Sequence, residues 1–405
     1  MARLLAEVTA LAGEAAAPRL VAVQPRIGVV CDFAEEGWPS MDLAAELLLD
    51  ALAASTDFRP SRIRPPMPRP FGGLPSTVAG GARHNADRAF GRYVAYPRWL
   101  RGRAGHADLF HVVDHSYAHL VHALPADRTV VTCHDLDAFR SLLDPALEPR
   151  GWLFRAATGR VLSGLRRAAR VVFDSAAVRD EAVARGVVDA DRSRVVPLPV
   201  HPDFSADSDV SADARAAEML GPRDGSIDIL HVGSTAPRKR IDVLLAAFAA
   251  IRAAQPTARL LRVGGALTVE QARTAEGLGI GGSIVELAPL DRPTLAAVYR
   301  RAAIVLLPSD REGFGLPLVE AMACGTPVLA SDLPVLREVG GPAAEYAPAG
   351  DADAFAAAAL RMLAASAGSP AAEVRRRRSV DRAATFRLDA YGDAIRAVYA
   401  EVLRG

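Results

Sequence analysis

One stretch of the C-terminal half, residues 302–331, constrains the fold more than any other part of the chain. It opens with the apolar run Ala302–Leu307 and passes through a glycine-containing turn, and a second segment begins at Pro317. This second segment ends near Gly325 and leads into the apolar run Pro327–Ala330. Proline just inside a helix and glycine just past its end are helix boundary signals. The stretch therefore predicts strand, turn, helix and strand, a unit that places ligands at the carboxyl edge of a parallel sheet.

Two acidic residues frame the predicted turn. Glu312 lies in the turn and Glu320 in the helix, with seven residues between them. The first amide groups of a helix lack partners within the helix and lie at its positive end. Amides suit phosphate and carboxylates suit hydroxyl groups, so the stretch predicts a nucleotide-sugar site. The alternative is that each glutamate is merely solvated or caps the helix; the coincidence of several signals favours the site.

The composition restricts the class of protein. A length of 405 residues predicts two or three domains, and a net charge of +1 gives no general attraction to nucleic acid, so no nucleic-acid partner is expected. Cys31, Cys133 and Cys324 are far apart in sequence and lie in or beside apolar runs. This pattern predicts buried thiols in a reducing compartment rather than disulfides or a metal site.

The chain has no run of 18 apolar residues, so no transmembrane helix is expected. Residues 1–18 are rich in alanine, but Glu7 and Glu14 interrupt any signal-peptide core. We expect a short surface helix there and a cytoplasmic protein.

Strands and helices alternate in two series along the chain. A polar, small-residue-rich connection begins at His201, and a new alternation begins at Ile227. Repeated β-α-β units predict parallel, doubly wound α/β sheets. We therefore predict an N-terminal domain at 1–205 and a C-terminal domain at 206–387, with a final helix at 388–405 packing back on the first domain.

Several polar residues follow the predicted strands of the first half. Trp38 and Ser40 lie in the loop after the first strand, and Ser40 is a suitable helix N-cap. His115 and His134 each fall where a strand ends. We predict acceptor contacts for Trp38, Ser40 and His115, and hydrogen bonding to sugar or phosphate for His134. The alternatives are an ordinary capped turn and structural histidines.

A metal site has two weak signals. His115 and His119 are four residues apart, and Asp135 and Asp137 form a DxD triplet directly after His134. Both patterns are short and arise often by chance, and no HxH or HExxH pair supports them. No metal is therefore expected.

The second half opens with a strand, a turn reading GSTAPRKR and a helix. Arg238 and Lys239 in this turn can neutralise a pyrophosphate, although such pairs are often only solvated. Gly264, after the next strand, permits close approach of a ligand to the backbone.

Farther on, Arg375–Arg378 is a run of four arginines that predicts a solvated helix face or contact with an anionic membrane surface.

These residues resemble the retaining GT-B glycosyltransferases of the glycosyltransferase family 4 type. The resemblance covers nearly the whole chain and is carried by HVGSTAPRKRIDVLLAAF at 231–248, LLRVGG at 260–265 and EGFGLPLVEAMACGTPVLAS at 312–331. It implies two Rossmann-like doubly wound domains facing a cleft, with the final helix crossing back to the N-terminal domain.

The resemblance also implies roles for the residues of the opening stretch. Glu312 would bind hydroxyls of the transferred sugar near the reacting carbon. Glu320 would hold the ribose hydroxyls of the nucleotide. The amides of Phe314, Gly315 and Leu316 would contact sugar and phosphate.

Other implied roles fall outside that stretch. Lys239 and Arg238 would neutralise the pyrophosphate, and His134 matches a histidine near the donor sugar. Ser234 stands on the donor side where many relatives carry arginine, so Arg238 is expected to take over that charge. The N-terminal loop has GWPSM at 37–41 in place of a common Gly-Gly element. The expected catalytic residues are Glu312, His134 and Lys239.

The implied reaction is transfer of a sugar from a nucleotide diphosphate sugar to an acceptor hydroxyl, with retention of configuration and without metal or cofactor. The acceptor is a glycan, a lipid-linked sugar or a small molecule. Two other classes stay open. An epimerase or phosphorolytic enzyme would consume donor without an acceptor, and a non-catalytic binding protein would not consume donor at all.

Overall fold

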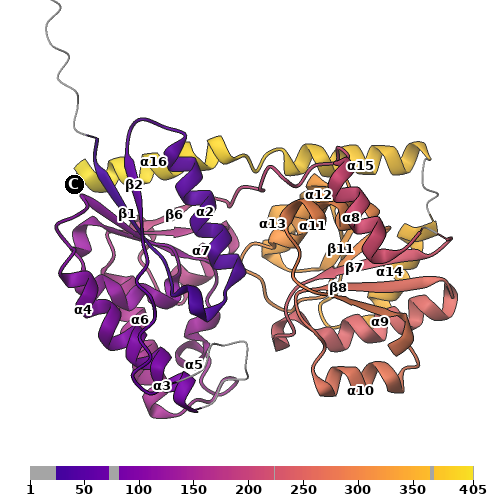
Figure 1. The fold of residues 1–405 in the computed structure, drawn as a ribbon, viewed down its shortest axis with the longest axis horizontal. Coiled ribbons are helices and arrows are strands. Elements are labelled where there is room, and N and C mark those ends of the chain that lie inside the picture. Colours follow the sequence, from indigo (N-terminus) through magenta and orange to yellow (C-terminus); the bar gives the residue numbers. More distant parts are fainter. Residues whose placement is uncertain (1–23, 73–81, 223, 365–368, 405) are drawn as a thin grey trace, which may run out of the picture.

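A computed structural model describes residues 24–72, 82–222, 224–364 and 369–404. Two six-stranded parallel sheets form the centres of two α/β halves (Figure 1). The strands of the first sheet are β1 (Arg26–Val30), β2 (Arg59–Ile63), β3 (Leu109–Val112), β4 (Thr129–Cys133), β5 (Arg170–Phe173) and β6 (Ser193–Val195). Those of the second are β7 (Ile227–Val232), β8 (Ala258–Val263), β9 (Ile284–Leu287), β10 (Ile304–Leu307), β11 (Val328–Ser331) and β12 (Glu345–Ala347).

The strand order places a reversal in the middle of each sheet. The first sheet runs β2-β1-β3-β4-β5-β6 and the second runs β9-β8-β7-β10-β11-β12. The direction in which successive strands are added to the sheet therefore reverses between β1 and β3, and between β7 and β10. In open parallel sheets, ligands bind at the carboxyl ends of strands at such switch points.

Both faces of each sheet are covered by helices. Neighbouring residues of β1 show this, since Val29 packs into one hydrophobic core and Val30 into another on the opposite face. The helices of the first half are α2 (Pro39–Ala53), α3 (Ala82–Phe90), α4 (Tyr96–Arg101), α5 (Arg140–Leu143), α6 (Trp152–Arg167) and α7 (Ala176–Ala184). The second half contains α8 (Val210–Leu220), α9 (Ile241–Ala254), α10 (Val269–Gly277), α11 (Arg292–Arg301), α12 (Leu316–Ala323), α13 (Pro334–Gly340) and α14 (Ala352–Ala364). The predicted doubly wound α/β fold is confirmed.

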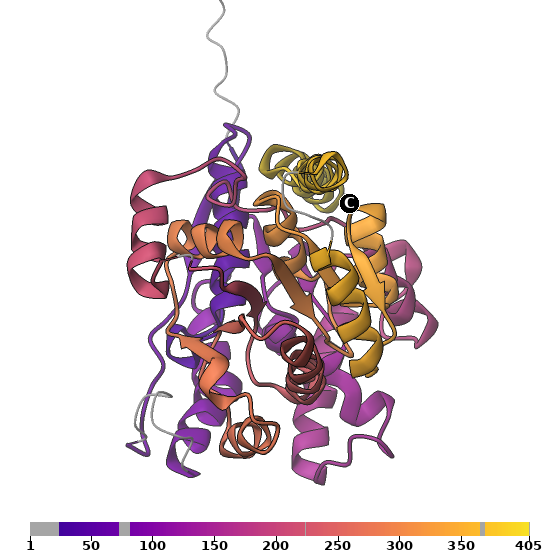
Figure 2. The same cartoon turned by 90° about the vertical axis from the view of Figure 1, so that its right-hand side faces the viewer.

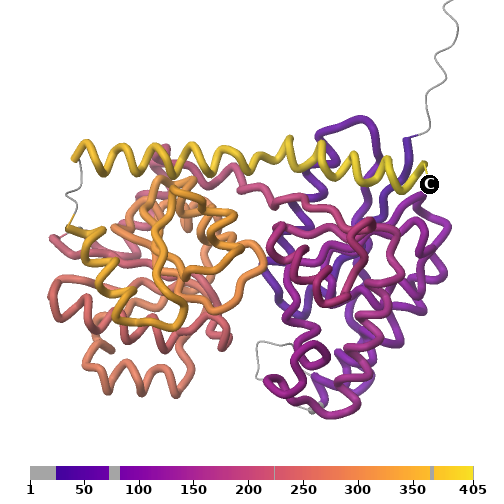
Figure 3. The backbone as a smooth tube through the Cα atoms, turned by 180° about the vertical axis from the view of Figure 1, so that it is seen from behind, coloured from indigo at the N-terminus to yellow at the C-terminus, as the bar shows by residue number. Residues whose placement is uncertain are grey.

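Two C-terminal helices run across both halves. α15 (Pro370–Ala383) lies over the second half and α16 (Leu388–Arg404) over the first (Figure 3). Figure 2 looks nearly along them. Glu401 pairs with Arg194 at 2.7 Å and with Arg170 at 3.1 Å, and Tyr399 Oη lies 2.6 Å from His111 Nδ1. These contacts fix the last helix to the first sheet, as the sequence predicted.

The structure differs from the sequence prediction at the start of α2. Ser40 is not an N-cap, because α2 begins at Pro39, whose fixed φ suits the first helical turn, and Trp38 takes the cap position. The predicted connection after His201 contains a helix, α8. The expected surface helix at 1–18 lies outside the described residues, and the domain division near residue 205 stays a prediction.

Candidate active site

Two loops meet at the switch point of the second sheet. One follows β7 and contains a short 3₁₀ turn, Pro237–Lys239; the other follows β10 and leads into α12. Because β7 and β10 are adjacent parallel strands, their carboxyl ends meet at one sheet edge. The amide of Asp310 donates to the carbonyl of Arg238 at 2.9 Å, which joins the two loops directly.

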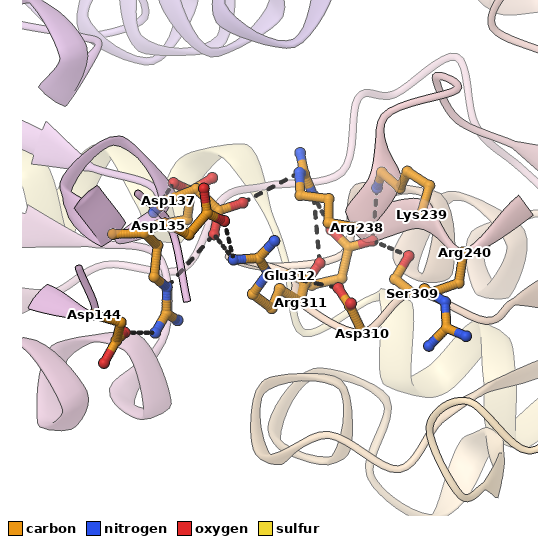
Figure 4. Close-up of polar contacts among 12 residues, drawn as sticks. Asp135, Asp137, Asp144, Arg238, Lys239, Arg240, Ser309, Asp310, Arg311 and Glu312 are labelled. Carbon is orange, nitrogen blue, oxygen red and sulfur yellow. Dashed lines mark hydrogen bonds and ion pairs between the residues drawn. The ribbon is translucent and has the colours of Figure 1, made fainter. Parts of the chain in front are cut away.

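Glu312 is the centre of this loop pair (Figure 4). Lys239 Nζ lies 2.6 Å from its Oε1, and Ser309 Oγ donates to the same oxygen at 2.7 Å. Arg238 lies 3.3 Å from Oε2. Burial alone favours the neutral carboxyl, but the two cations outweigh it and hold the pKa of Glu312 below its usual value. Glu312 is therefore an oriented carboxylate in a basic surrounding.

Two arginines of these loops, Arg238 and Arg311, reach across to the first half. Arg238 pairs with Asp137 at 3.4 Å, and Arg311 pairs with Asp137 at 3.5 Å (Figure 4). Arg311 also pairs with Glu148 at 3.4 Å. Asp137 follows β4, so the pairs connect the carboxyl edges of the two sheets.

Gly313 brings the backbones of the two halves into contact. A Cβ atom at this position would lie 1.9 Å from the His134 carbonyl oxygen, so any side chain requires the two loops to separate. Ser175 Oγ donates to the Gly313 carbonyl at 3.0 Å. Gly315, with φ of +93°, then turns the chain into α12, a conformation that favours glycine.

His134 is buried, and both ring nitrogens have protein partners. Nδ1 lies 2.6 Å from Asp174, and Nε2 donates to the Val113 carbonyl at 2.9 Å. Burial disfavours the charged ring, but Asp174 outweighs it and raises the pKa of His134 to about 9. Hydrogen bonding of this ring to a sugar or phosphate requires one of these contacts to exchange, and that role stays a prediction.

His115 is also buried, and the centre of its ring lies 6.2 Å from that of His134. Its Nδ1 accepts from the His134 amide at 3.3 Å, and its Nε2 lies 3.5 Å from Asp135. Its side chain thus supports the loop that faces Gly313. In the described part of the chain, no three His, Cys, Asp or Glu side chains are grouped so that they could hold a metal ion.

Glu320 lies one turn into α12 and is 7% exposed. Its Oε2 accepts from Tyr299 Oη at 2.8 Å, and burial raises the pKa of the carboxyl to about 7. The side chain of Phe314 packs against Phe386 in the core, and Leu316 begins α12. Phe314 and Leu316 can therefore serve the site through their amides rather than their side chains.

The edge between β7 and β8 holds the other predicted donor residues. Ser234 is exposed in the turn after β7, where its Oγ accepts from the Ala236 amide at 3.4 Å. Gly264 has φ of +122°, and a Cβ there would lie 2.5 Å from the Gly233 carbonyl oxygen. Gly264 therefore packs closely against the neighbouring turn of the protein, and the approach of a ligand to its backbone stays a prediction.

Arg262 and His231 were not predicted as site residues from the sequence, and both contact this turn at Gly233. Arg262 is fully buried, donates to the Gly233 carbonyl at 3.3 Å, and leaves Nε and Nη1 without a hydrogen-bond partner among the described residues. Burial and the nearby Arg262 lower the pKa of His231 to about 3, so the ring is neutral. A charged residue inside the apolar run LLRV was the available signal.

The predicted acceptor residues separate in the structure. Trp38 is 50% exposed and Ser40 is exposed on the first turn of α2, whereas His115 is buried. At the switch point between β1 and β3, the structure instead places Asp32 beside Arg64 at 3.5 Å. Burial, then the nearby Asp114, raise the pKa of Asp32 to about 7.

A second contact between the halves was also missed. Glu338 of α13 accepts from the amides of Ala176 at 2.7 Å and Ala177 at 2.8 Å, at the start of α7. A carboxylate at a helix N-terminus is stabilising. Only the docking of the two halves reveals this pair.

The four arginines of α15 do not form one surface. Arg376 donates to the Ala206 carbonyl at 3.2 Å, and Arg377 lies 3.9 Å from Glu373. Arg375 and Arg378 line a hollow of about 470 Å³ together with Val328, Pro342, Ala343, Glu345, Met362, Pro370, Ala371 and Val374.

Comparison with known proteins gives two family matches. Residues 58–204 match the profile described as Glycosyltransferase Family 4, and residues 226–365 match Glycosyl transferases group 1. A D-inositol 3-phosphate glycosyltransferase of Mycolicibacterium paratuberculosis is 37% identical over 217 residues, which are 51% of this chain and 47% of that protein. The chain spans about half the length of the curated relatives it matches.

Solved structures share the fold over nearly the whole chain. Sucrose-phosphate synthase from Thermosynechococcus elongatus superposes with a TM-score of 0.75 at 20% identity, covering 94% of this chain and 99% of that one. HepE of Anabaena, solved in complex with UDP and glucose, has a TM-score of 0.68 at 16% identity and covers 93% and 100% of the two chains. At these identities the likeness describes the fold.

Proposed function

Because this chain belongs to the GT-B glycosyltransferases of the family 4 and group 1 type, we propose that it transfers a sugar from a nucleotide diphosphate sugar to an acceptor hydroxyl. The observation that carries the proposal is the partly buried group of Glu312, Lys239 and Arg238 at the switch point of the second sheet. It combines a carboxylate for hydroxyls with cations for a diphosphate at the start of a helix.

The proposed reaction retains the anomeric configuration and needs no metal ion. The bond between the sugar carbon and the diphosphate oxygen breaks, and the acceptor oxygen bonds to the same face of that carbon. The acceptor proton passes to the departing diphosphate oxygen. Lys239, Arg238 and the first amides of α12 stabilise the charge on the leaving group, each contributing on the order of a few kcal/mol.

The acceptor is proposed to meet the donor from the first half, near Asp32 and the exposed Trp38. Relatives that match half of this chain are named D-inositol 3-phosphate glycosyltransferases, so inositol phosphate is the first acceptor to test. Glycans and lipid-linked sugars follow.

The test begins with thermal shifts against UDP-, GDP-, ADP- and TDP-sugars. The donor that stabilises the chain is then incubated with the acceptors, with and without EDTA, and the product linkage is read by proton NMR. An inverted product, a requirement for metal, or a glycosyl group trapped on a side chain would each contradict the mechanism. Donor consumption without any acceptor would favour an epimerase or phosphorolytic enzyme.

A further inference from the structure

The loop after α5 and the first turn of α6 together expose an unusual amount of apolar surface. Leu147 is 83% exposed, Trp152 76%, Leu153 66% and Phe154 52%. We call these four residues the α6 apolar tip. Large contiguous exposed apolar groups on a soluble protein mark a surface that meets a partner.

The geometry of α6 explains why the tip cannot fold back onto the protein. Trp152, Leu153 and Phe154 are consecutive in the first turn, so their side chains point around the helix rather than to one face. The buried residues of α6 begin only at Thr158. The first turn and a half therefore extends beyond the packed part of the domain, and α5 beside it lies at the end away from α16 (Figure 1).

The charges around the tip are basic. Arg150, Arg155 and Arg160 are exposed, and none of them forms an ion pair within the described ranges. Arg150 lies over the Phe154 ring at 5.4 Å. The nearby acids are already neutralised, because Glu148 pairs with Arg311.

Asp144, just before the tip in the chain, is neutralised in the same way. It pairs with Arg140 at 3.0 Å and with Arg185 at 2.9 Å. The tip therefore combines exposed aromatic and aliphatic groups with arginines that form no ion pair with any described residue, a combination that suits a partner that is both apolar and anionic.

We propose that the α6 apolar tip docks on the surface of an anionic lipid bilayer. Aromatic side chains flanked by arginine suit the interface, where rings enter the headgroup region and guanidinium groups bind lipid phosphates. A second copy of this chain is disfavoured, because a two-fold contact through the tip would bring two basic patches of the same charge together. Among the described helices none is long and apolar enough to cross a bilayer.

One ion pair also connects the tip region to the candidate active site. Glu148, one residue from Leu147, holds Arg311, and Arg311 precedes Glu312. Docking would therefore place the loop after β10 near the bilayer surface. The docking proposal does not depend on sugar transfer and is tested without it.

Vesicle co-sedimentation of the full chain tests the proposal. The chain should pellet with phosphatidylcholine vesicles containing phosphatidylglycerol and much less with phosphatidylcholine alone. Combined Trp152→Ser, Leu153→Ser and Phe154→Ser should weaken this partition by about tenfold or more, since three apolar groups that would enter the bilayer interface are lost. Arg150→Glu with Arg155→Glu should weaken it too, and added salt should do the same for the wild type.

Matched variants make the result specific. Val210→Ser with Val269→Ser removes exposed apolar groups elsewhere, 85% and 70% exposed, and should leave vesicle binding unchanged. Arg375→Glu with Arg378→Glu should also leave it unchanged. Loss of binding in that α15 variant but not in the tip variants would overturn the proposal, as would equal binding to neutral vesicles.

Fluorescence places the contact at the tip itself. Trp152 emission should shift to shorter wavelength with anionic vesicles, and Trp152→Phe should keep binding while losing that shift. Absence of wild-type binding would contradict the proposal. So would concentration-dependent dimerisation that the tip variant abolishes, because a second copy would then occupy the surface.

Discussion

Lys239 Nζ lies 2.6 Å from Oε1 of Glu312, although the two residues are 73 positions apart in the chain. They meet because each follows one of two adjacent parallel strands, β7 and β10. Both side chains are largely buried, with 11% and 9% of their surface exposed. The pair therefore binds the two loops to each other and keeps Glu312 ionised.

Lys239→Met should destabilise the fold at neutral pH. Removing one partner leaves a buried carboxylate with only Arg238 as a cation, and such losses cost roughly 3 kcal/mol. Glu312 has a lowered pKa in the folded state, so its contribution is present above the ordinary carboxyl pKa and is lost as pH falls. The difference between wild type and variant in urea unfolding should thus shrink in acid.

A double-mutant cycle with Glu312→Gln separates this pair from general damage. The two substitutions together should cost at least about 1 kcal/mol less than the sum of the single ones. Additive effects would mean that the 2.6 Å contact carries no coupling.

Gly313→Ala should open the contact between the two halves. Its Cβ would lie 1.9 Å from the His134 carbonyl oxygen, a backbone atom that cannot rotate away. We expect a larger radius of gyration in small-angle scattering, with little change in far-UV circular dichroism. Gly282→Ala is the control, because a Cβ there has no neighbour within 4 Å. An unchanged radius in the Gly313 variant would place the contact outside the solution structure.

Glu320→Gln should change the pH dependence of stability. Burial raises the folded pKa of Glu320 to about 7, so the folded state favours the protonated carboxyl. Stability from this group is full below its ordinary pKa near 4.5 and falls as pH rises toward 7. The amide removes that loss, so the variant should gain stability relative to wild type, on the order of a few kcal/mol, by pH 7 and above. A constant difference across this range would contradict the assignment.

Much of the fold could be predicted because its signals are local. The stretch 302–331 gave strand, turn, helix and strand from apolar runs, Pro317 and Gly325, and the structure places β10, α12 and β11 there. The meeting of Glu312 with Lys239 follows from strand order. His134 and Asp174 could have been paired in the same way, since each directly follows one of two neighbouring strands.

Contacts between the halves could not be read from the chain. Arg238 with Asp137, and Glu338 with the start of α7, depend on how two separately wound sheets dock. No periodicity in either half encodes that docking. Arg262 was not predicted as a site residue for another reason. Its neighbours define an ordinary buried strand, and only its charge departs from the pattern.

Isothermal titration calorimetry combined with turnover tests the central claim most directly, using the nucleotide sugar identified by thermal shift. Glu312→Gln should keep nucleotide diphosphate affinity near the wild-type value while turnover falls by about a hundredfold, because the sugar loses its carboxylate. Glu320→Ala should weaken nucleotide affinity by about tenfold, because the ribose hydroxyls lose theirs. The reverse result, lost nucleotide binding in the Glu312 variant and normal binding in the Glu320 variant, would contradict the proposed site.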